Sequence, residues 1–385
     1  MNLAETQNSV KKGILFTISA IFIFYLGKFA INQTYGLYLK INPPKIPEPA
    51  AAFGPLPQLK MTNVQIKGIP EYVLETVDGK LPRFSDRAYV YQVNQPQGTL
   101  LSEQRMKQLA QDLNFTSSFT KTSPSEFRWV DGVNSRTLNA NVITKNFSLQ
   151  TNTNKLGSVV SSVGSINNND AQDMVMGFLK AKGLINQQDI ETLSFRSVPS
   201  QVVIGQLKEV SKINPITKVM NVNVYRSIVE KISPEKENRY PVLGPNPRKS
   251  LIKFLVTNEG KVFRFPNIDF TYWDVNYNTK SDYYISPIQN VWATIVRGQG
   301  INTYIKPDNG DYYGEFSTLE IEKINIREIY VAYYEQEELA QYLQPIYVFE
   351  GQFITKPLPG QISQTGEIVI YFPAIRGDFV KSNQE

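Results

Sequence analysis

The chain has 385 residues and a net charge of +5 at pH 7, and it contains neither histidine nor cysteine. It therefore cannot use an imidazole proton shuttle, a thiolate nucleophile, a dithiol redox pair, or a zinc site built on His or Cys. The 40 basic and 35 acidic residues are interspersed along the sequence, which argues against a nucleic-acid-binding arm. The absence of thiols also fits a domain exported from the cytoplasm.

The segment 13–31 (GILFTISAIFIFYLGKFAI) is apolar throughout except for Lys28. As a helix it would be roughly 29 Å long, about the thickness of the hydrocarbon core of a bilayer. It has no polar face, and no pair of small residues follows it where a signal-peptide cleavage site would lie. We therefore predict an uncleaved transmembrane anchor that contacts membrane lipid, with Lys28 extending its ammonium group towards the headgroups.

The orientation of this anchor follows from its flanks. Lys11 and Lys12 lie in the preceding tail, 1–12, and favour a cytoplasmic N-terminus. Lys40 and Lys45 on the other side reduce the charge asymmetry, but long domains are translocated largely regardless of such charges. We expect a single-pass protein of the plasma (inner) membrane whose C-terminal domains are extracytoplasmic.

The segment 32–58 follows the anchor and contains six prolines between Asn42 and Pro57. Because proline excludes helix and central strand, this pattern predicts a stiff, extended spacer between the membrane and the first domain. The alternative is a loop that packs on the surface of that domain.

The remaining sequence predicts an α+β protein in which a helix packed on an antiparallel sheet occurs three times. The first such domain covers 59–150, with a helix that begins at Ser102. A linker rich in Ser and Asn, 151–168, separates it from a second unit, 169–280, whose helix begins at Asp170 and stops at Gly183. The third unit, 281–385, opens with Ser286 as a cap and a proline at the first helical position.

The C-terminal half resembles a known family of membrane regulators. The resemblance lies in the short helix Ser286–Trp292 ending at Arg297–Gly300, in the strands Ile329–Tyr334, Gln344–Gly351 and Ile370–Ala374, and in the helix Asp170–Gly183. These segments are similar to PepSY-like modules and to membrane-anchored extracytoplasmic regulatory proteins of the YycH/YycI type. The similarity implies units with a PepSY-like or cystatin-like fold. The resemblance implies a non-enzymatic role in modulating a membrane partner such as a sensor kinase or a protease, and it carries over no catalytic motif. The first domain, 59–150, has no counterpart there.

The densest group of aromatic residues is a candidate binding site for a partner protein or a glycan. It consists of Tyr272, Trp273, Tyr277, Tyr283 and Tyr284. Aromatic faces can stack on sugar rings or grip an extended peptide, although alternate members of such a group often simply pack a sheet. Both interpretations are open from the sequence.

Catalytic patterns in the chain are weak. Ser118 and Lys121 match a Ser-x-x-Lys nucleophile motif, but the accompanying Lys-Thr-Gly motif is absent. A carboxylate pair for glycan hydrolysis could be drawn from Glu75, Asp131, Asp269 and Asp274. The segment Pro307–Asp311 is rich in oxygen ligands but lacks the spacing of a calcium loop, so a tight turn is expected there. We predict no catalytic residue, no cofactor and no metal site.

Three functions remain as hypotheses. The first is a non-enzymatic, membrane-anchored protein that binds and regulates or scaffolds another envelope or membrane protein. The second is a module that binds cell-wall glycan through the aromatic group, and the third is a carboxylate-based glycan hydrolase. No nucleic-acid partner is expected.

Overall fold

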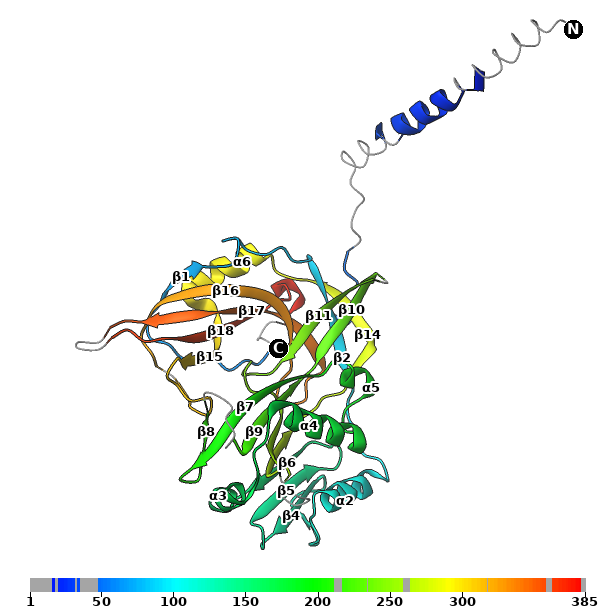
Figure 1. Ribbon diagram of the computed structural model, residues 1–385. Coiled ribbons are helices and arrows are strands. Elements are labelled where there is room, and N and C mark those ends of the chain that lie inside the picture. Colours follow the sequence, from blue (N-terminus) through cyan, green and yellow to red (C-terminus); the bar gives the residue numbers. More distant parts are fainter. Residues whose placement is uncertain are drawn as a thin grey trace, which may run out of the picture. The chain divides into compact units, whose positions relative to one another are not determined.

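The computed structural model describes residues 16–17, 20–31, 33–34, 48–210, 217–233, 235–258, 264–316, 318–357 and 362–381 (Figure 1). The chain forms two compact units, Met1–Glu48 and Pro49–Glu385. In the first unit, residues 20–31 are helical. Within the described ranges, no helix combines the length and the apolar character needed to cross a membrane. Residues 13–15, 18–19 and most of the predicted spacer lie outside the described residues.

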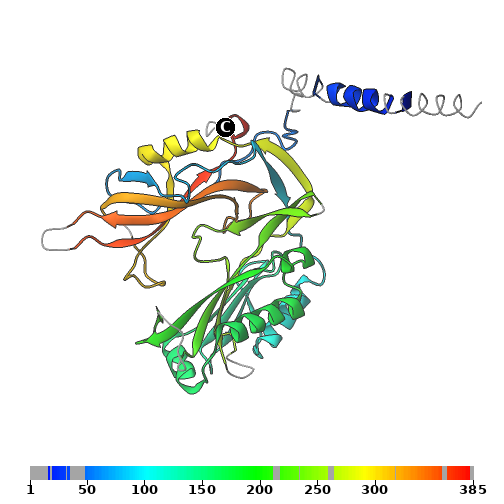
Figure 2. The ribbon, with the colours of Figure 1, turned by 45° about the horizontal axis from the view of Figure 1, so that its top comes forward.

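The second unit is α+β, as the sequence predicts, and its described strands form two nine-stranded sheets (Figure 2). Sheet I is built around two strands of 14 residues each, β16 and β17. Its members are β1 (Glu71–Leu74), β2 (Arg87–Val93), β10 (Ser227–Ser233), β11 (Lys236–Leu243), β14 (Val275–Tyr284), β15 (Ile301–Pro307), β16 (Ile321–Tyr334), β17 (Tyr342–Thr355) and β18 (Thr365–Pro373). Strands β1 and β11 run parallel to β16, and the other pairs are antiparallel.

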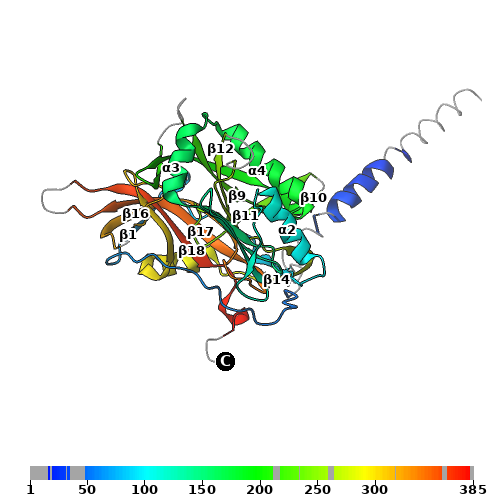
Figure 3. The ribbon, with the colours of Figure 1, turned by 90° about the horizontal axis from the view of Figure 1, so that it is seen from below.

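Sheet II is antiparallel throughout its described pairs. In spatial order it contains β3 (Thr120–Lys121), β4 (Glu126–Asp131), β5 (Arg136–Asn141), β6 (Phe147–Thr151), β13 (Asn267–Phe270), β12 (Ile252–Thr257), β9 (Val219–Tyr225), β7 (Ser194–Val203) and β8 (Gln206–Glu209). The helices α2 (Ser102–Asp112) and α4 (Asn168–Lys182) lie over one face, and α3 (Thr153–Ser162) covers the other (Figure 3). Alternation along β9 explains this division, because Val219 packs against α3 while Met220 faces the opposite way.

The predicted helices are present, with small changes at their ends. Helix α4 buries Ala171, Val175 and Leu179 along one face and ends at Gly183, which has the left-handed φ of +56° that favours glycine. Its N-cap is Asn167, whose side chain accepts a hydrogen bond from the Asp170 amide, and not Asp170 itself. The third predicted helix is α6 (Ile288–Thr294), which packs on sheet I. Its N-cap is Pro287, so the prediction of Ser286 as the cap is wrong.

The chain does not divide into the three consecutive units that we predicted. Its described strands cross between the sheets four times, after β2, β9, β11 and β13. Strand β6 of the predicted first domain pairs with β13 of the predicted second unit, so the boundary at 150 falls inside sheet II. The predicted linker 151–168 contains helix α3, because Leu156, Val159 and Val160 give its Ser- and Asn-rich sequence one buried face.

The described end of the predicted spacer, residues 49–58, is packed on sheet I. The Ala50 amide donates to Asp282 Oδ1 over 2.9 Å, and the Leu56 amide donates to the Phe379 carbonyl over 2.8 Å. Leu56 is fully buried. For this part of the segment the surface-loop alternative is correct, because its apolar residues find a core to cover.

Candidate functional site

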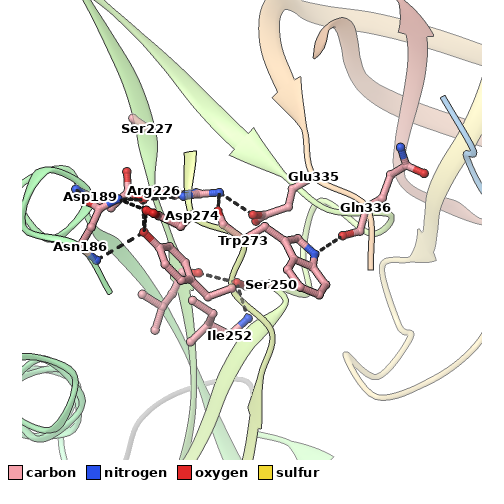
Figure 4. Close-up of polar contacts among 12 residues, drawn as sticks. Asn186, Asp189, Arg226, Ser227, Ser250, Ile252, Trp273, Asp274, Glu335 and Gln336 are labelled. Atoms are coloured by element: carbon pink, nitrogen blue, oxygen red, sulfur yellow. Dashed lines mark hydrogen bonds and ion pairs between the residues drawn. The ribbon is translucent and has the colours of Figure 1, made fainter. Parts of the chain in front are cut away.

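A group of charged and aromatic side chains meets where the chain passes from one sheet to the other (Figure 4). Arg226 separates β9 of sheet II from β10 of sheet I, and Glu335 directly follows β16. Asp189 lies in the short helix α5 (Gln187–Ile190), Tyr272 lies in the crossing from β13 to β14, and Tyr277 lies in β14. We call these five residues the junction cluster.

Arg226 is the centre of the junction cluster. Its Nη1 donates to Asp189 Oδ2 over 2.5 Å, and its Nη2 donates to Glu335 Oε1 over 2.5 Å. Nη2 also donates to the carbonyl of Trp273 over 2.8 Å. The guanidinium carbon lies 4.9 Å from the centre of the Tyr272 ring, a cation–π distance. One buried cation therefore ties three separate chain segments together.

Asp189 is held in place by its own helix and by two phenols. Asn186 caps α5 by accepting a hydrogen bond from the Asp189 amide over 2.7 Å. The hydroxyls of Tyr272 and Tyr277 donate to the two carboxylate oxygens of Asp189. Burial raises the pKa of both tyrosines, so they remain protonated donors. Asp189 itself is fully buried, and hydrogen bonding to both oxygens satisfies its carboxylate.

The charges within the junction cluster do not balance. Two carboxylates, Asp189 and Glu335, share one guanidinium, so the cluster carries a net charge of −1 when both are ionised. Burial raises the pKa of Glu335, and Arg226 only partly opposes this effect. Burial alone would lower the pKa of Arg226, but Glu335 and Asp189 outweigh it and raise that pKa. Glu335 therefore takes up a proton at a higher pH than an exposed glutamate does.

We predict that Glu335→Gln changes how stability depends on pH. Because the folded-state pKa of Glu335 is raised above 4.5, its contribution is fully present below that pH and is lost as the pH rises through the folded-state pKa. The free energy of unfolding of the wild type, relative to Glu335→Gln, should therefore fall as the pH rises above about 4.5. Urea unfolding over a series of pH values measures the difference.

Glu320→Gln is the matched control for this prediction. Glu320 is exposed, and its hydrogen bond with Lys356 lowers its pKa. The stability of the wild type relative to Glu320→Gln should rise with pH, which is the opposite sign. If both variants gave the same slope, Glu335 would not be the proton-accepting group.

The five aromatic residues predicted as one binding surface are divided between two places. Tyr272 and Tyr277 belong to the junction cluster, and the indole Nε1 of Trp273 donates to the Gln336 carbonyl over 3.0 Å. Tyr283 is fully buried and donates to the Gly54 carbonyl, while Tyr284 lies under the guanidinium groups of Arg87 and Arg376. Trp273 and Tyr283 are buried, so they pack the fold and present no ring for a sugar to stack on.

The four candidate acids are each engaged by a different group. Glu75 pairs with Arg327 at 3.4 Å and Asp269 with Lys253 at 3.2 Å. Asp131 accepts hydrogen bonds from Asn134 in the turn after β4, and Asp274 accepts from Asn94 and Asn186 at 2.7 and 2.6 Å. These interactions fit acids that hold turns and crossings in place.

Two smaller sequence features can also be located. The Pro307–Asp311 segment is a tight turn, as predicted, closed by the Gly310 amide donating to the Pro307 carbonyl over 2.8 Å. Among the described residues, no three His, Cys, Asp or Glu side chains lie close enough to share a metal ion.

A cavity of about 20 Å³ beside Arg226, Tyr272 and Glu335 has room for about one water molecule.

Comparison with known proteins adds little to this description. The sequence matches no protein-family model and no curated protein. Among solved structures, the chain is similar to an uncharacterized protein from Eubacterium rectale, with 11% identity, a TM-score of 0.39, and coverage of 76% of this chain and 85% of that one. At this TM-score the similarity supports no inference about fold or function.

The sequence gives little indication of the central residues of the junction cluster. Arg226 lies in an otherwise strand-like run, and nothing around it distinguishes it from a surface arginine. The only local signal was Asn186 three residues before Asp189, a spacing typical of a helix N-cap. That signal predicts the start of helix α5 but not the ion pair.

Proposed function

We propose that this chain is a non-enzymatic, single-pass membrane protein whose extracytoplasmic α+β body binds and regulates or scaffolds another envelope or membrane protein. Residues 13–31 are the anchor, with the N-terminus in the cytoplasm. The apolar run itself carries the proposal, because nineteen residues with a single charge have the length and composition of a membrane span. The resemblance of the C-terminal half to PepSY-like and YycH/YycI-type regulators supports it.

The hairpin between β7 and β8 is the part of the body that best fits protein docking. Its two-residue turn places Ile204 at φ +49° followed by Gly205 at φ +73°, the backbone of a type I′ turn. Ile204 is β-branched, so this conformation is strained, and its side chain is 98% exposed. Strain at an exposed apolar residue motivates a functional role, since it stabilises neither the turn nor the core.

We predict that Ile204→Asn stabilises the protein by about 1 kcal/mol, because asparagine tolerates the left-handed region and suits a type I′ turn. Urea unfolding measures this gain as a higher midpoint, provided that the dependence of the free energy on urea concentration is the same in both proteins. The same variant should weaken partner binding, because it removes the exposed apolar side chain. A loss of stability would contradict the strain argument.

The natural absence of cysteine allows a direct test of topology. Single cysteines can be introduced as Ser9→Cys in the N-terminal tail and Val133→Cys in the turn after β4, where Val133 is 85% exposed. A membrane-impermeant maleimide added to intact cells should label Val133→Cys but not Ser9→Cys, and both should react after lysis. Labelling of Ser9→Cys alone, or of neither before lysis, would overturn the proposed location.

Partner binding is tested with single cysteines introduced into the same cysteine-free protein. A photo-crosslinker attached at Ile204→Cys in intact cells should give a discrete protein adduct, and the matched label at Val133→Cys should not. Val133 is a suitable control because it is a similarly exposed apolar residue on a different hairpin. Identical adducts at both positions, or none at either, would count against docking through β7 and β8.

A further inference from the structure

A groove of about 520 Å³ lies between helices α2 and α4 on the helix-covered face of sheet II. Its apolar walls come from Met174, Phe178 and Phe265, and Arg136 and Leu113 also line it. The ion pair between Lys182 of α4 and Asp112 of α2, 2.7 Å long, joins the two helices at its rim. We call this the α2–α4 groove.

Arg136 occupies a position in the groove where an apolar side chain would be expected. It begins β5, and Leu138 and Ala140, the next residues on the same face of the strand, are buried in the core. Arg136 is only 1% exposed, and burial lowers its pKa. Taking a guanidinium out of water is unfavourable unless charged or hydrogen-bonding partners replace the water.

The partners that Arg136 has do not fully replace the water. Its Nη1 donates to the Leu113 carbonyl at the end of α2 over 3.1 Å, and the guanidinium lies 5.0 Å from the centre of the Phe115 ring. Its Nε has no hydrogen-bond partner in the part of the chain that the structure describes. The charge of Asp131 acts on Arg136, but the carboxylate of Asp131 accepts its hydrogen bond from Asn134. Arg136 is therefore a buried cation with which no carboxylate of the described residues forms an ion pair.

The middle of α4 contributes a second observation. Gly177 lines the groove within a 15-residue helix, where glycine destabilises by about 1 kcal/mol relative to alanine. A Cβ atom built at Gly177 would meet nothing within 4 Å, so close packing does not require glycine there. The missing side chain leaves open space in front of the helix, directly on the wall of the groove.

We infer that the α2–α4 groove binds an amphipathic carboxylate, in which an apolar group packs on Met174, Phe178 and Phe265 while the carboxylate pairs with Arg136. A guanidinium and a carboxylate form strong charge-assisted hydrogen bonds, and these strengthen away from bulk water. The rim carries two basic residues, Lys182 and Arg264, and two acidic ones, Asp112 and Asp173. These four charges cancel, so with Arg136 included the groove has a net charge of +1.

The test compares two probes of similar shape, N-acetyl-phenylalanine, which carries a charged carboxylate, and its neutral amide. Their affinities are measured by isothermal titration calorimetry with the full-length protein. The acid should bind at least tenfold more tightly than the amide, since a hydrogen bond to a charged group is worth about 1.5–3 kcal/mol. Equal affinity for the two probes, or binding of neither, would overturn the inference. Because the protein is unchanged, this comparison does not depend on the folding of any variant.

A pair of tryptophan variants establishes where the probe binds. Gly177→Trp should fill the groove and abolish binding of the acid, whereas Gly132→Trp, in the exposed turn after β4 and outside the groove, should bind it normally. Circular dichroism confirms that both variants are folded. If Gly177→Trp were folded and still bound the acid with wild-type affinity, the site would not be this groove.

The carboxylate could belong to a small acid or to the C-terminus of a peptide. A pentapeptide ending in phenylalanine, with a free or an amidated C-terminus, separates these sources. Tighter binding of the free peptide than of N-acetyl-phenylalanine assigns the groove to a peptide terminus, and tighter binding of the small acid assigns it to a small molecule. Loss of the preference for free over amidated peptide would contradict pairing with Arg136.

Discussion

Replacing Arg226 with methionine is expected to lower the free energy of unfolding by about 3–5 kcal/mol. The change leaves the buried Asp189 and the largely buried Glu335 without their shared cation, and both are within 2.5 Å of the guanidinium in the wild type. It also removes the hydrogen bond to the Trp273 carbonyl. The loss should be larger than that of any surface ion pair in the chain, since exposed pairs contribute about 0–1 kcal/mol.

A triple variant distinguishes loss of charge balance from loss of packing. Arg226→Met combined with Asp189→Asn and Glu335→Gln makes the junction cluster neutral at nearly constant volume. It should recover much of the stability lost in the single variant, because replacing a whole buried ionic group is often close to neutral. Urea unfolding of the full-length proteins measures both. If the triple variant were as unstable as Arg226→Met alone, packing and not the uncompensated charges would account for the loss.

A surface pair provides the matched control. Lys60 and Glu338 form an ion pair at 3.3 Å with both side chains more than 80% exposed. Lys60→Met should therefore leave the unfolding midpoint nearly unchanged. The contrast between the two substitutions isolates burial as the cause.

Local features of this fold were predictable from the sequence because they depend on neighbouring residues. The apolar spacing of Met106, Leu109 and Ala110 gives the buried face of α2, and Gly183 ends α4 through its left-handed backbone. Alternating strands and tight turns likewise follow from residues close together in the chain. The α+β class could be derived in this way.

The division of strands between the two sheets could not be predicted locally. Alternation shows which side chains of a strand face the core, but it does not specify which strand lies beside it. Tyr91 of β2, for example, pairs with Leu343 of β17, far along the chain. Local patterns therefore predict that consecutive segments form consecutive domains, although the chain returns to each sheet after leaving it.

The junction cluster shows the same limit for side chains. Tyr272 and Tyr277 are a candidate pair in the sequence because they are close together along the chain. Their role depends on Asp189 and Arg226, which approach them only in the folded chain. Arg136 is a comparable case, since its alternation with Leu138 places it inward but does not show which groups surround it. A sequence gives the direction of a side chain more readily than its partners.

Replacing Gly351 with alanine is expected to destabilise the protein by about 3 kcal/mol, the upper part of the range for overpacking. Gly351 lies in β17, opposite Ile326 of β16 on one side and Ile368 of β18 on the other. A Cβ atom there would lie 2.2 Å from the Asn325 carbonyl oxygen and 3.0 Å from the Ile326 Cα. The obstructing atoms are backbone, so relief requires movement of β16 and cannot come from a change of rotamer.

Gly132→Ala is the appropriate control for this substitution. Gly132 lies in the exposed turn after β4, where an added Cβ meets nothing within 4 Å and the backbone φ is not positive. It should change the urea midpoint little or raise it slightly, because alanine reduces the entropy of the unfolded chain. The register of β16 shifts between Ile326 and Glu328, beside the position that faces Gly351. If Gly351→Ala were as stable as Gly132→Ala, this irregularity would be able to absorb a methyl group, and sheet I would be more deformable at its centre than its close backbone contact implies.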